Sequence, residues 1–263
     1  MISQIKPNTI RNCDAYDGLR ELPDNSVDMV IADPPYNISQ DSLSIKRNNL
    51  RSPSFKRAAD VKLDFGEWDK WTEEQFYEFT EKWFKECVRV LKPKGWFFSF
   101  FSKERIGYFC DPRNGLFLQN GINVKTIITW HKTNPVTSFR KMNYLSSTEF
   151  IVVGSKGESK IPNFLLQKDM HNFYETPNSS IYGETDHPTE KPVSLVKWLI
   201  ITATNEGDLV LDPFMGSGTT AVAARSVGRN FIGFEIDENY CKMAKKRIEK
   251  NMVMYDITQF EGF

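Results

Sequence analysis

Short apolar runs alternate with amphipathic stretches along most of the chain. The apolar runs predict strands at residues 8–12, 27–32, 95–101, 124–130, 148–153, 208–212 and 230–235. The stretches between them predict helices at residues 72–92, 103–119, 190–204, 217–228 and 237–250. The first of these helices is opened by Thr72 with Glu74 and Gln75, and it stops before Pro93 and Gly95. This alternation predicts an α/β fold with a Rossmann-like, mostly parallel sheet of seven strands and helices on both faces.

Two irregular segments interrupt the alternation. Residues 37–62 are basic, and their position directly after a predicted strand end favours contact with phosphates over a merely solvated surface. Residues 155–186 are rich in Asn, Ser and Thr, with scattered aromatic side chains. This second segment is either an insertion that reads base edges or a long surface excursion.

Composition limits the class of protein. The 263 residues, 40% hydrophobic and 26% charged, can bury one large core, so residues 1–263 are expected to form a single domain. Lys+Arg and Asp+Glu number 34 each, so affinity for nucleic acid has to come from local patches. The four cysteines form no C-x-x-C pair, which indicates neither a zinc cluster nor a disulfide scaffold, and no metal is predicted. No segment approaches the roughly 20 apolar residues of a membrane span, and a cytoplasmic location is expected.

The apolar run 27–32 ends in the motif Asp33-Pro34-Pro35-Tyr36. A strand that breaks into Pro-Pro delivers a rigid turn to a sheet edge. The turn offers a carboxylate, fixed carbonyls and an aromatic ring, which together suit a planar ring that carries an amino group. The carboxylate and a Pro carbonyl accept the amine's hydrogen bonds while the tyrosine stacks on the ring. On these four residues alone, a strand with an ordinary Pro-rich turn is an equally good interpretation.

A loop with two glycines follows the apolar run 208–211, with the sequence Asp212-Pro213-Phe214-Met215-Gly216-Ser217-Gly218-Thr219-Thr220. The glycines allow close backbone approach, and the helix that starts at once presents free N–H groups to a ligand. No lysine follows Gly218, unlike in a P-loop, and Ala221 replaces the third glycine of the dinucleotide fingerprint. The next strand ends in Glu235, where α/β folds bind ribose hydroxyls. The pattern indicates a nucleoside ligand without a pyrophosphate, such as S-adenosylmethionine.

Together these motifs resemble those of S-adenosylmethionine-dependent DNA amino-methyltransferases, which modify adenine N6 or cytosine N4. In that family D-P-P-Y is the catalytic motif and D-P-F-x-G-S-G-T-T the cofactor motif, and both are matched here without a gap. The catalytic motif comes first, then a variable segment, then His187-Pro188-Thr189-Glu190-Lys191-Pro192, and then the cofactor loop. This is the circularly permuted order of the beta class. The resemblance covers nearly the whole chain and implies the class I methyltransferase fold.

The resemblance also implies roles for individual residues. Asp14, with Ala15 beside it, matches the acidic position that meets the adenine of the cofactor, although Asp14 also fits a helix N-cap. Glu235 matches the ribose position, and Asp33 lies at both the catalytic and the cofactor site. The remaining cofactor positions are matched by Asp212, Phe214, Gly216, Ser217, Gly218, Thr219, Thr220, His187, Thr189, Lys191 and Pro192. In the basic segment, contacts with DNA are expected from Lys46, Arg47, Asn48, Asn49, Arg51, Lys56 and Arg57.

The expected mechanism follows from the chemistry of an exocyclic amine, whose lone pair is delocalised into the ring. Asp33 and the carbonyl of Pro34 accept the two N–H bonds and turn the lone pair toward the sulfonium methyl. Tyr36 is the expected platform for a base swung out of the duplex, with Pro35 completing the turn. In the family, Asp at the first motif position is typical of adenine enzymes and Ser of cytosine enzymes, so N6 of adenine is the predicted target.

Alternative functions remain open on the sequence. Cytosine N4 is the nearest alternative, and an RNA or protein-glutamine amino-methyltransferase uses a similar turn but places its cofactor loop first. A non-catalytic nucleic-acid-binding module is a further alternative. DNA is the expected partner, and the sequence leaves open a cognate restriction endonuclease and a homodimer.

Overall fold

The structure is a computed structural model that describes residues 5–37, 71–135, 144–178 and 190–260, without side chains for 252–260. The chain divides into two compact units. The larger unit consists of residues 1–34 and 81–263, and the smaller one of residues 35–80. The helix α3 (Glu73–Val90) runs from one unit into the other.

The larger unit is built around one sheet with the strand order β1-β8-β7-β2-β3-β5-β4-β6. Its strands are β1 (Thr9–Asn12), β2 (Val27–Ala32), β3 (Leu91–Phe101), β4 (Ile122–Lys132), β5 (Thr148–Lys156), β6 (Phe173–Thr176), β7 (Leu209–Asp212) and β8 (Asn230–Glu235). Five of the seven pairings are parallel, and β5 pairs antiparallel with both β3 and β4. The predicted α/β class and mostly parallel sheet are therefore confirmed.

The number of strands differs from the prediction, because the described part of the chain forms a sheet of eight strands rather than seven. The additional strand, β6, comes last in the order of the described strands and pairs with β4. Its four residues alternate between exposed and half-buried positions, so the sequence has no apolar run there. All seven predicted strands are present, and β3, β4 and β5 extend beyond their predicted ends.

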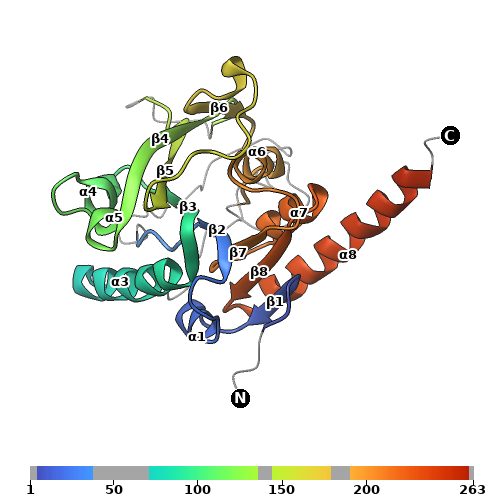
Figure 1. Ribbon diagram of the computed structural model, residues 1–263, viewed down its shortest axis with the longest axis horizontal. Helices are drawn as coiled ribbons and strands as arrows, with labels where there is room; N and C mark the ends of the chain where they lie inside the picture. Colours follow the sequence, from blue (N-terminus) through green and yellow to red (C-terminus); the bar gives the residue numbers. More distant parts are fainter. Residues whose placement is uncertain (1–4, 38–70, 136–143, 179–189, 261–263) are drawn as a thin grey trace, which may run out of the picture. The chain divides into compact units, whose positions relative to one another are not determined.

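The other helices of the larger unit are α1 (Ala15–Arg20), α4 (Ile106–Cys110), α5 (Leu116–Gln119), α6 (Val193–Ala203), α7 (Thr219–Ser226) and α8 (Glu238–Phe260). The prediction of one helix at 103–119 is wrong, since two short helices occupy that range. Pro112 lacks an N–H group, and the extended backbone of Gly115 starts α5 as its N-cap. Figure 1 shows α6 and α7 on one side of the sheet and α1, with the C-terminal half of α3, on the other.

The core is dominated by strands whose side chains are buried on both faces, as expected for a parallel sheet covered by helices. In β2 five of the six residues are buried, and three of the four in β7. These two strands are parallel neighbours, with Met29 opposite Val210 and Val30 opposite Leu211. Because β2 and β7 are parallel neighbours, their carboxyl ends lie side by side, and so do the residues that directly follow them, Asp33 and Pro213.

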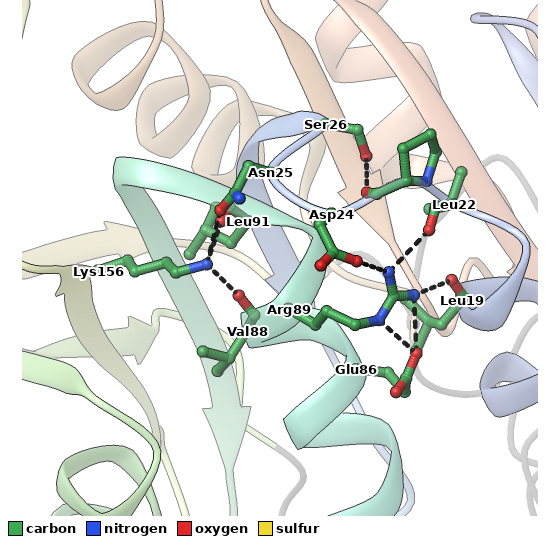
Figure 2. Close-up of polar contacts among 11 residues, drawn as sticks. Leu19, Leu22, Asp24, Asn25, Ser26, Glu86, Val88, Arg89, Leu91 and Lys156 are labelled. Atoms are coloured by element: carbon green, nitrogen blue, oxygen red, sulfur yellow. Dashed lines mark hydrogen bonds and ion pairs between the residues drawn. The ribbon is translucent and has the colours of Figure 1, made fainter.

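A polar cluster secures the C-terminal end of α3 (Figure 2). The Lys156 ammonium, at the end of β5, donates hydrogen bonds to the carbonyls of Val88 and Leu91, both at 2.7 Å. Arg89 in the last helical turn donates to the carbonyls of Leu19 and Leu22, both at 2.9 Å. Lys156 thus binds carbonyls where α3 ends and β3 begins, while Arg89 ties the end of α3 to the end of α1.

In the smaller unit, the described residues are 35–37 and 71–80. The Asn37 amide donates to the Trp71 carbonyl at 2.8 Å and accepts from the Trp71 N–H at 3.0 Å. The predicted helix start is confirmed as a capping box. The Thr72 N–H donates to the Gln75 side chain at 2.9 Å, and the Gln75 N–H donates to the Thr72 hydroxyl at 3.3 Å.

Candidate active site

Asp33 stands directly after β2, and its side chain is paired with a lysine. The ammonium of Lys191 donates to Oδ2 of Asp33 at 2.6 Å. The lysine side chain is only 10% exposed and that of Asp33 is 26% exposed. A carboxylate has about four acceptor positions, so it can accept from Lys191 and from a further donor at the same time. The pair therefore holds a partly accessible carboxylate at the carboxyl edge of the sheet.

Lys191 does not face Asp33 alone. Its ammonium lies 3.5 Å from Oε2 of Glu149 on β5, and Oε1 of Glu149 lies 2.5 Å from the ammonium of Lys132 at the end of β4. Lys191 also lies over the ring of Phe100, 5.1 Å from its centroid. The four charged side chains form a chain of alternating sign, which we call the charge ladder: Asp33, Lys191, Glu149 and Lys132.

The charge ladder shifts the ionisation of its buried members. Burial by itself lowers the pKa of Lys191, but the carboxylates of Asp33 and Glu149 outweigh burial and raise that pKa to about 12. Burial raises the pKa of Glu149, but the two lysines outweigh it, so that the pKa lies below its ordinary value. Lys191 and Glu149 therefore both remain charged near neutral pH.

The predicted cofactor loop connects β7 to α7. Gly218 caps α7 with φ +85°, a left-handed conformation that favours glycine, and a Cβ there would lie 2.9 Å from Cβ of Ala244. The N–H of Gly216 donates to Oε2 of Glu235 at 2.8 Å. The ring of Phe214 packs edge-on against Trp83 of α3, with centroids 5.1 Å apart. The loop is thus held from β8 and from α3.

Asp212 at the start of this loop has an unusual ionisation. Burial raises its pKa to about 7, with a further contribution from the negative charge of Asp33, although hydrogen bonds from Thr220 and from the Phe214 N–H oppose the shift. The N–H of Phe214 lies 2.9 Å from Oδ1 of Asp212. Glu235 is affected similarly, because burial raises its pKa while hydrogen bonds from backbone N–H groups lower it. Two neighbouring acids that resist ionisation form a site that favours a cationic ligand.

A buried ion pair joins the loop to the segment that carries Lys191. Nη2 of Arg247 on α8 donates to Oε1 of Glu190 at 2.6 Å, and both side chains are at most 5% exposed. Nη1 of Arg247 donates to the hydroxyls of Ser217 and Thr219, at 3.3 and 3.1 Å. The Thr219 hydroxyl in turn donates to the Lys191 carbonyl at 3.3 Å. Arg247 on α8 therefore connects the cofactor loop and the start of α7 to Glu190, which precedes α6.

Asp14 caps α1, with its side chain accepting from the N–H groups of Tyr16 and Asp17 at 2.8 and 3.4 Å. The N-cap interpretation is confirmed, and the role toward a cofactor stays a prediction. Asn12, two residues earlier, lies opposite Glu235 across the β1–β8 pairing, so Asp14 and Glu235 follow neighbouring strand ends. Ala15 is buried beside it in the first turn of α1.

The structure brings most of the predicted residues to one edge of the sheet. Asp33 and Pro34, the loop 212–220, Lys191 and Pro192 belong to the larger unit, with Pro192 as the N-cap of α6. Pro35 and Tyr36 belong to the smaller unit. His187, Thr189, Lys46, Arg47, Asn48, Asn49, Arg51, Lys56 and Arg57 lie outside the described residues.

Four residues near the site were missed by sequence reasoning, and none of them lies in a predicted motif. They are Glu149 and Lys132 of the charge ladder, Arg247 beside the loop, and Trp83 against Phe214. The available signal was weak: a lone acid and a lone lysine at strand ends, and one arginine among the many charges of α8. Part of the irregular segment 155–186 forms β6, whose neighbour Asn178 donates its N–H to Asn134 at 2.5 Å.

Comparisons with known proteins place the chain in a family. Residues 27–246 match the family model of N6/N4 methyltransferases, described as DNA methylase. The chain is 34% identical over 249 residues to the Type II methyltransferase M2.DpnII of Streptococcus pneumoniae, covering 90% of this chain and 87% of the relative. The chain therefore belongs to the N6/N4 family of DNA methylases, and the resemblance noted from its motifs is confirmed.

Solved structures agree with this assignment. The S-adenosylmethionine complex of M1.HpyAVI superimposes with a TM-score of 0.64 at 28% identity, covering 91% of this chain and 98% of that one. The cytosine-N4-specific PvuII DNA methyltransferase superimposes with a TM-score of 0.67 over 96% of this chain and 93% of that one, but at 18% identity this likeness shows the fold alone. The predicted class of enzyme, a DNA methyltransferase that uses S-adenosylmethionine, is thereby confirmed.

The described residues include neither a membrane-spanning helix nor a metal-binding group of side chains. No helix among them is both long and apolar enough to cross a membrane. No group of three or more His, Cys, Asp or Glu side chains among them could hold a metal ion.

Proposed function

We propose that this DNA methylase transfers the methyl group of S-adenosylmethionine to N6 of an adenine that has been swung out of the DNA duplex. The observation that carries the proposal is the position of Asp33, a partly accessible carboxylate at the end of β2, beside the loop that follows β7. An aromatic amine needs an acceptor for its N–H groups before its lone pair can attack the methyl carbon. The carboxylate of Asp33 and the carbonyl of Pro34 supply the two acceptors.

The methyl donor fits the neighbouring loop chemically. S-adenosylmethionine carries a cationic sulfonium group, and burial of Asp212 and Glu235 leaves acids that gain from a nearby positive charge. The backbone of Gly216 to Gly218 comes close to the ligand without an intervening Cβ. We assign the methionine half of the cofactor to this loop, the ribose to Glu235 and the adenine to the region of Asp14.

Methyl transfer then needs no covalent intermediate on the protein. The amine nitrogen forms a bond to the methyl carbon as the bond from carbon to sulfur breaks, and the sulfur leaves as a neutral thioether. Positive charge moves from sulfur to nitrogen, where the Asp33 carboxylate stabilises it until a proton is lost. Tyr36 is assigned to stack on the extruded base, and the basic segment 37–62 to contact phosphates.

Cytosine N4 is the alternative target, because it presents the same amine chemistry. A digest of host DNA to nucleosides, after expression of the chain, separates the two by mass spectrometry. We expect N6-methyladenine and no N4-methylcytosine. The opposite result would replace adenine by cytosine, and a digest without either base would refute the proposed function.

Three finer assignments also belong to this proposal. The Type II names of the relatives support a cognate restriction endonuclease for this chain. DNA from the expressing host should then resist cleavage by that endonuclease at the methylated sequence. Base reading is assigned to the segment 155–186. A homodimer in the cytoplasm is proposed as the working form, and light scattering of the purified protein measures its mass.

A further inference from the structure

The charge ladder raises a question about the catalytic carboxylate. Asp33 has to stabilise positive charge on the amine, yet the ammonium of Lys191 lies 2.6 Å from it. A cation at that distance cancels much of the negative potential that the carboxylate would offer. Glu149 is the second acid at the same lysine, with Oε2 at 3.5 Å from its ammonium. Lys191 is therefore shared between two carboxylates rather than committed to one.

The surroundings make this sharing effective. The side chains of Lys191 and Lys132 are 10% and 14% exposed, so water screens their charges poorly. Glu149 pairs with a lysine at each oxygen, since its Oε1 lies 2.5 Å from the ammonium of Lys132 and its Oε2 lies 3.5 Å from that of Lys191. It also stands on β5, opposite Trp130 of β4, so its backbone is set by the sheet. The ladder is thus a mostly buried row of charges rather than a set of solvent-exposed ones.

We infer that Glu149 is a positioning residue for methyl transfer, which acts through Lys191 to preserve the negative charge of Asp33 toward the amine. This inference rests on the proposed function. With Glu149 present, Asp33, Lys191 and Glu149 together carry one net negative charge. Replacing Glu149 by glutamine reduces that sum to zero and leaves Asp33 as the carboxylate facing Lys191 within the ladder.

Lys132 gives the inference a signed test. Removal of Lys132 leaves Glu149 to pair with Lys191 alone, which draws the lysine away from Asp33. We therefore expect E149Q to slow methyl transfer and K132M to leave its rate unchanged or raise it. A merely structural ladder predicts that both variants slow the reaction, in proportion to their loss of thermal stability.

The experiment measures single-turnover methyl transfer to a DNA duplex, with enzyme in excess and saturating S-adenosylmethionine. E149Q is expected to be about 10-fold slower, which corresponds to about 1.4 kcal/mol of barrier, and E149D to recover part of the rate. The affinity of E149Q for S-adenosylmethionine is expected to stay within about threefold of the wild type, or roughly 0.7 kcal/mol. E158Q is the matched control, since Glu158 pairs with Lys125 near the opposite end of β4, and it should behave as wild type.

The outcomes separate this inference from the proposed function. A wild-type protein that forms no N6-methyladenine refutes the proposed function itself. If the wild type is active and E149Q transfers the methyl group at a rate within twofold of the wild type, the inference about Glu149 is wrong and the proposed function stands. If E149Q does not fold, the rates of K132M and E149D test the inference instead. Equal slowing of methyl transfer in both variants, with equal losses of melting temperature, would overturn the inference.

Discussion

The pair formed by Arg247 and Glu190 offers a sharp test of how the cofactor loop is held. Both side chains are at most 5% exposed, and Arg247 also donates to the hydroxyls of Ser217 and Thr219. R247M keeps much of the side-chain volume but removes the guanidinium that pairs with the buried Glu190 carboxylate. Removing one partner of such a pair costs about 3–5 kcal/mol. A chain of this length melts about 2–4 °C lower for each kcal/mol, so R247M should melt roughly 6–20 °C below the wild type.

The assay is thermal unfolding followed by circular dichroism, supported by urea titration. K242M is the matched control on the same helix, because Lys242 pairs with Glu238 at the surface, where both side chains are more than 60% exposed. It should cost less than about 1 kcal/mol. The double variant R247M/E190Q should recover a large part of the loss, since it removes the buried charge as well. An R247M protein that melts within the range of K242M would refute the reasoning.

Two further predictions concern the cofactor loop. Burial raises the pKa of Asp212 to about 7, and a sulfonium cation favours its ionised form, so affinity for S-adenosylmethionine should rise between pH 5.5 and 7.5. Without the cofactor, folded Asp212 binds a proton that the unfolded chain releases from about pH 4 upward, so this residue lowers stability as pH rises toward 7. Calorimetric titration of S-adenosylmethionine into wild type and D212N checks the predicted rise in affinity, and an equal pH dependence of affinity in both proteins would contradict it. G218A should lose stability through its left-handed backbone, by about 1–2 kcal/mol, and also weaken cofactor binding because its Cβ would meet Ala244. G121A, with φ +75° and open space around it, is the control that has the backbone strain alone, and equal cofactor affinity in both variants would contradict the prediction.

Much of the fold could be predicted because buried parallel strands appear as apolar runs in the sequence. The run at β2 and the run at β8 match their strands at both ends. β6 escaped prediction because its order comes from pairing with β4 and not from a local apolar pattern. The break between α4 and α5 was missed although Pro112 lies between them, since the flanking residues keep a helical spacing of apolar side chains.

The candidate site likewise has one set of residues that the sequence indicates and another that it does not. Asp33 and the loop 212–220 could be predicted because each set of residues is contiguous and ends a strand. Glu149 and Arg247 could not, because each reaches the site only through tertiary structure. Glu149 arrives there through the placement of β5 between β3 and β4, and this strand order cannot be read from the spacing of apolar residues.

The remaining prediction is also the most direct test of the central claim, that the Asp33 carboxylate prepares an adenine amine for methyl transfer. The measurement is transfer of a labelled methyl group from S-adenosylmethionine to DNA by the wild type and by D33A. Binding of S-adenosylmethionine and the melting temperature are measured on the same samples. We expect the wild type to produce N6-methyladenine and D33A to lose at least about 100-fold in rate while it remains folded, as expected when a major transition-state contact is removed. A folded D33A protein that methylates adenine at the wild-type rate would contradict the account.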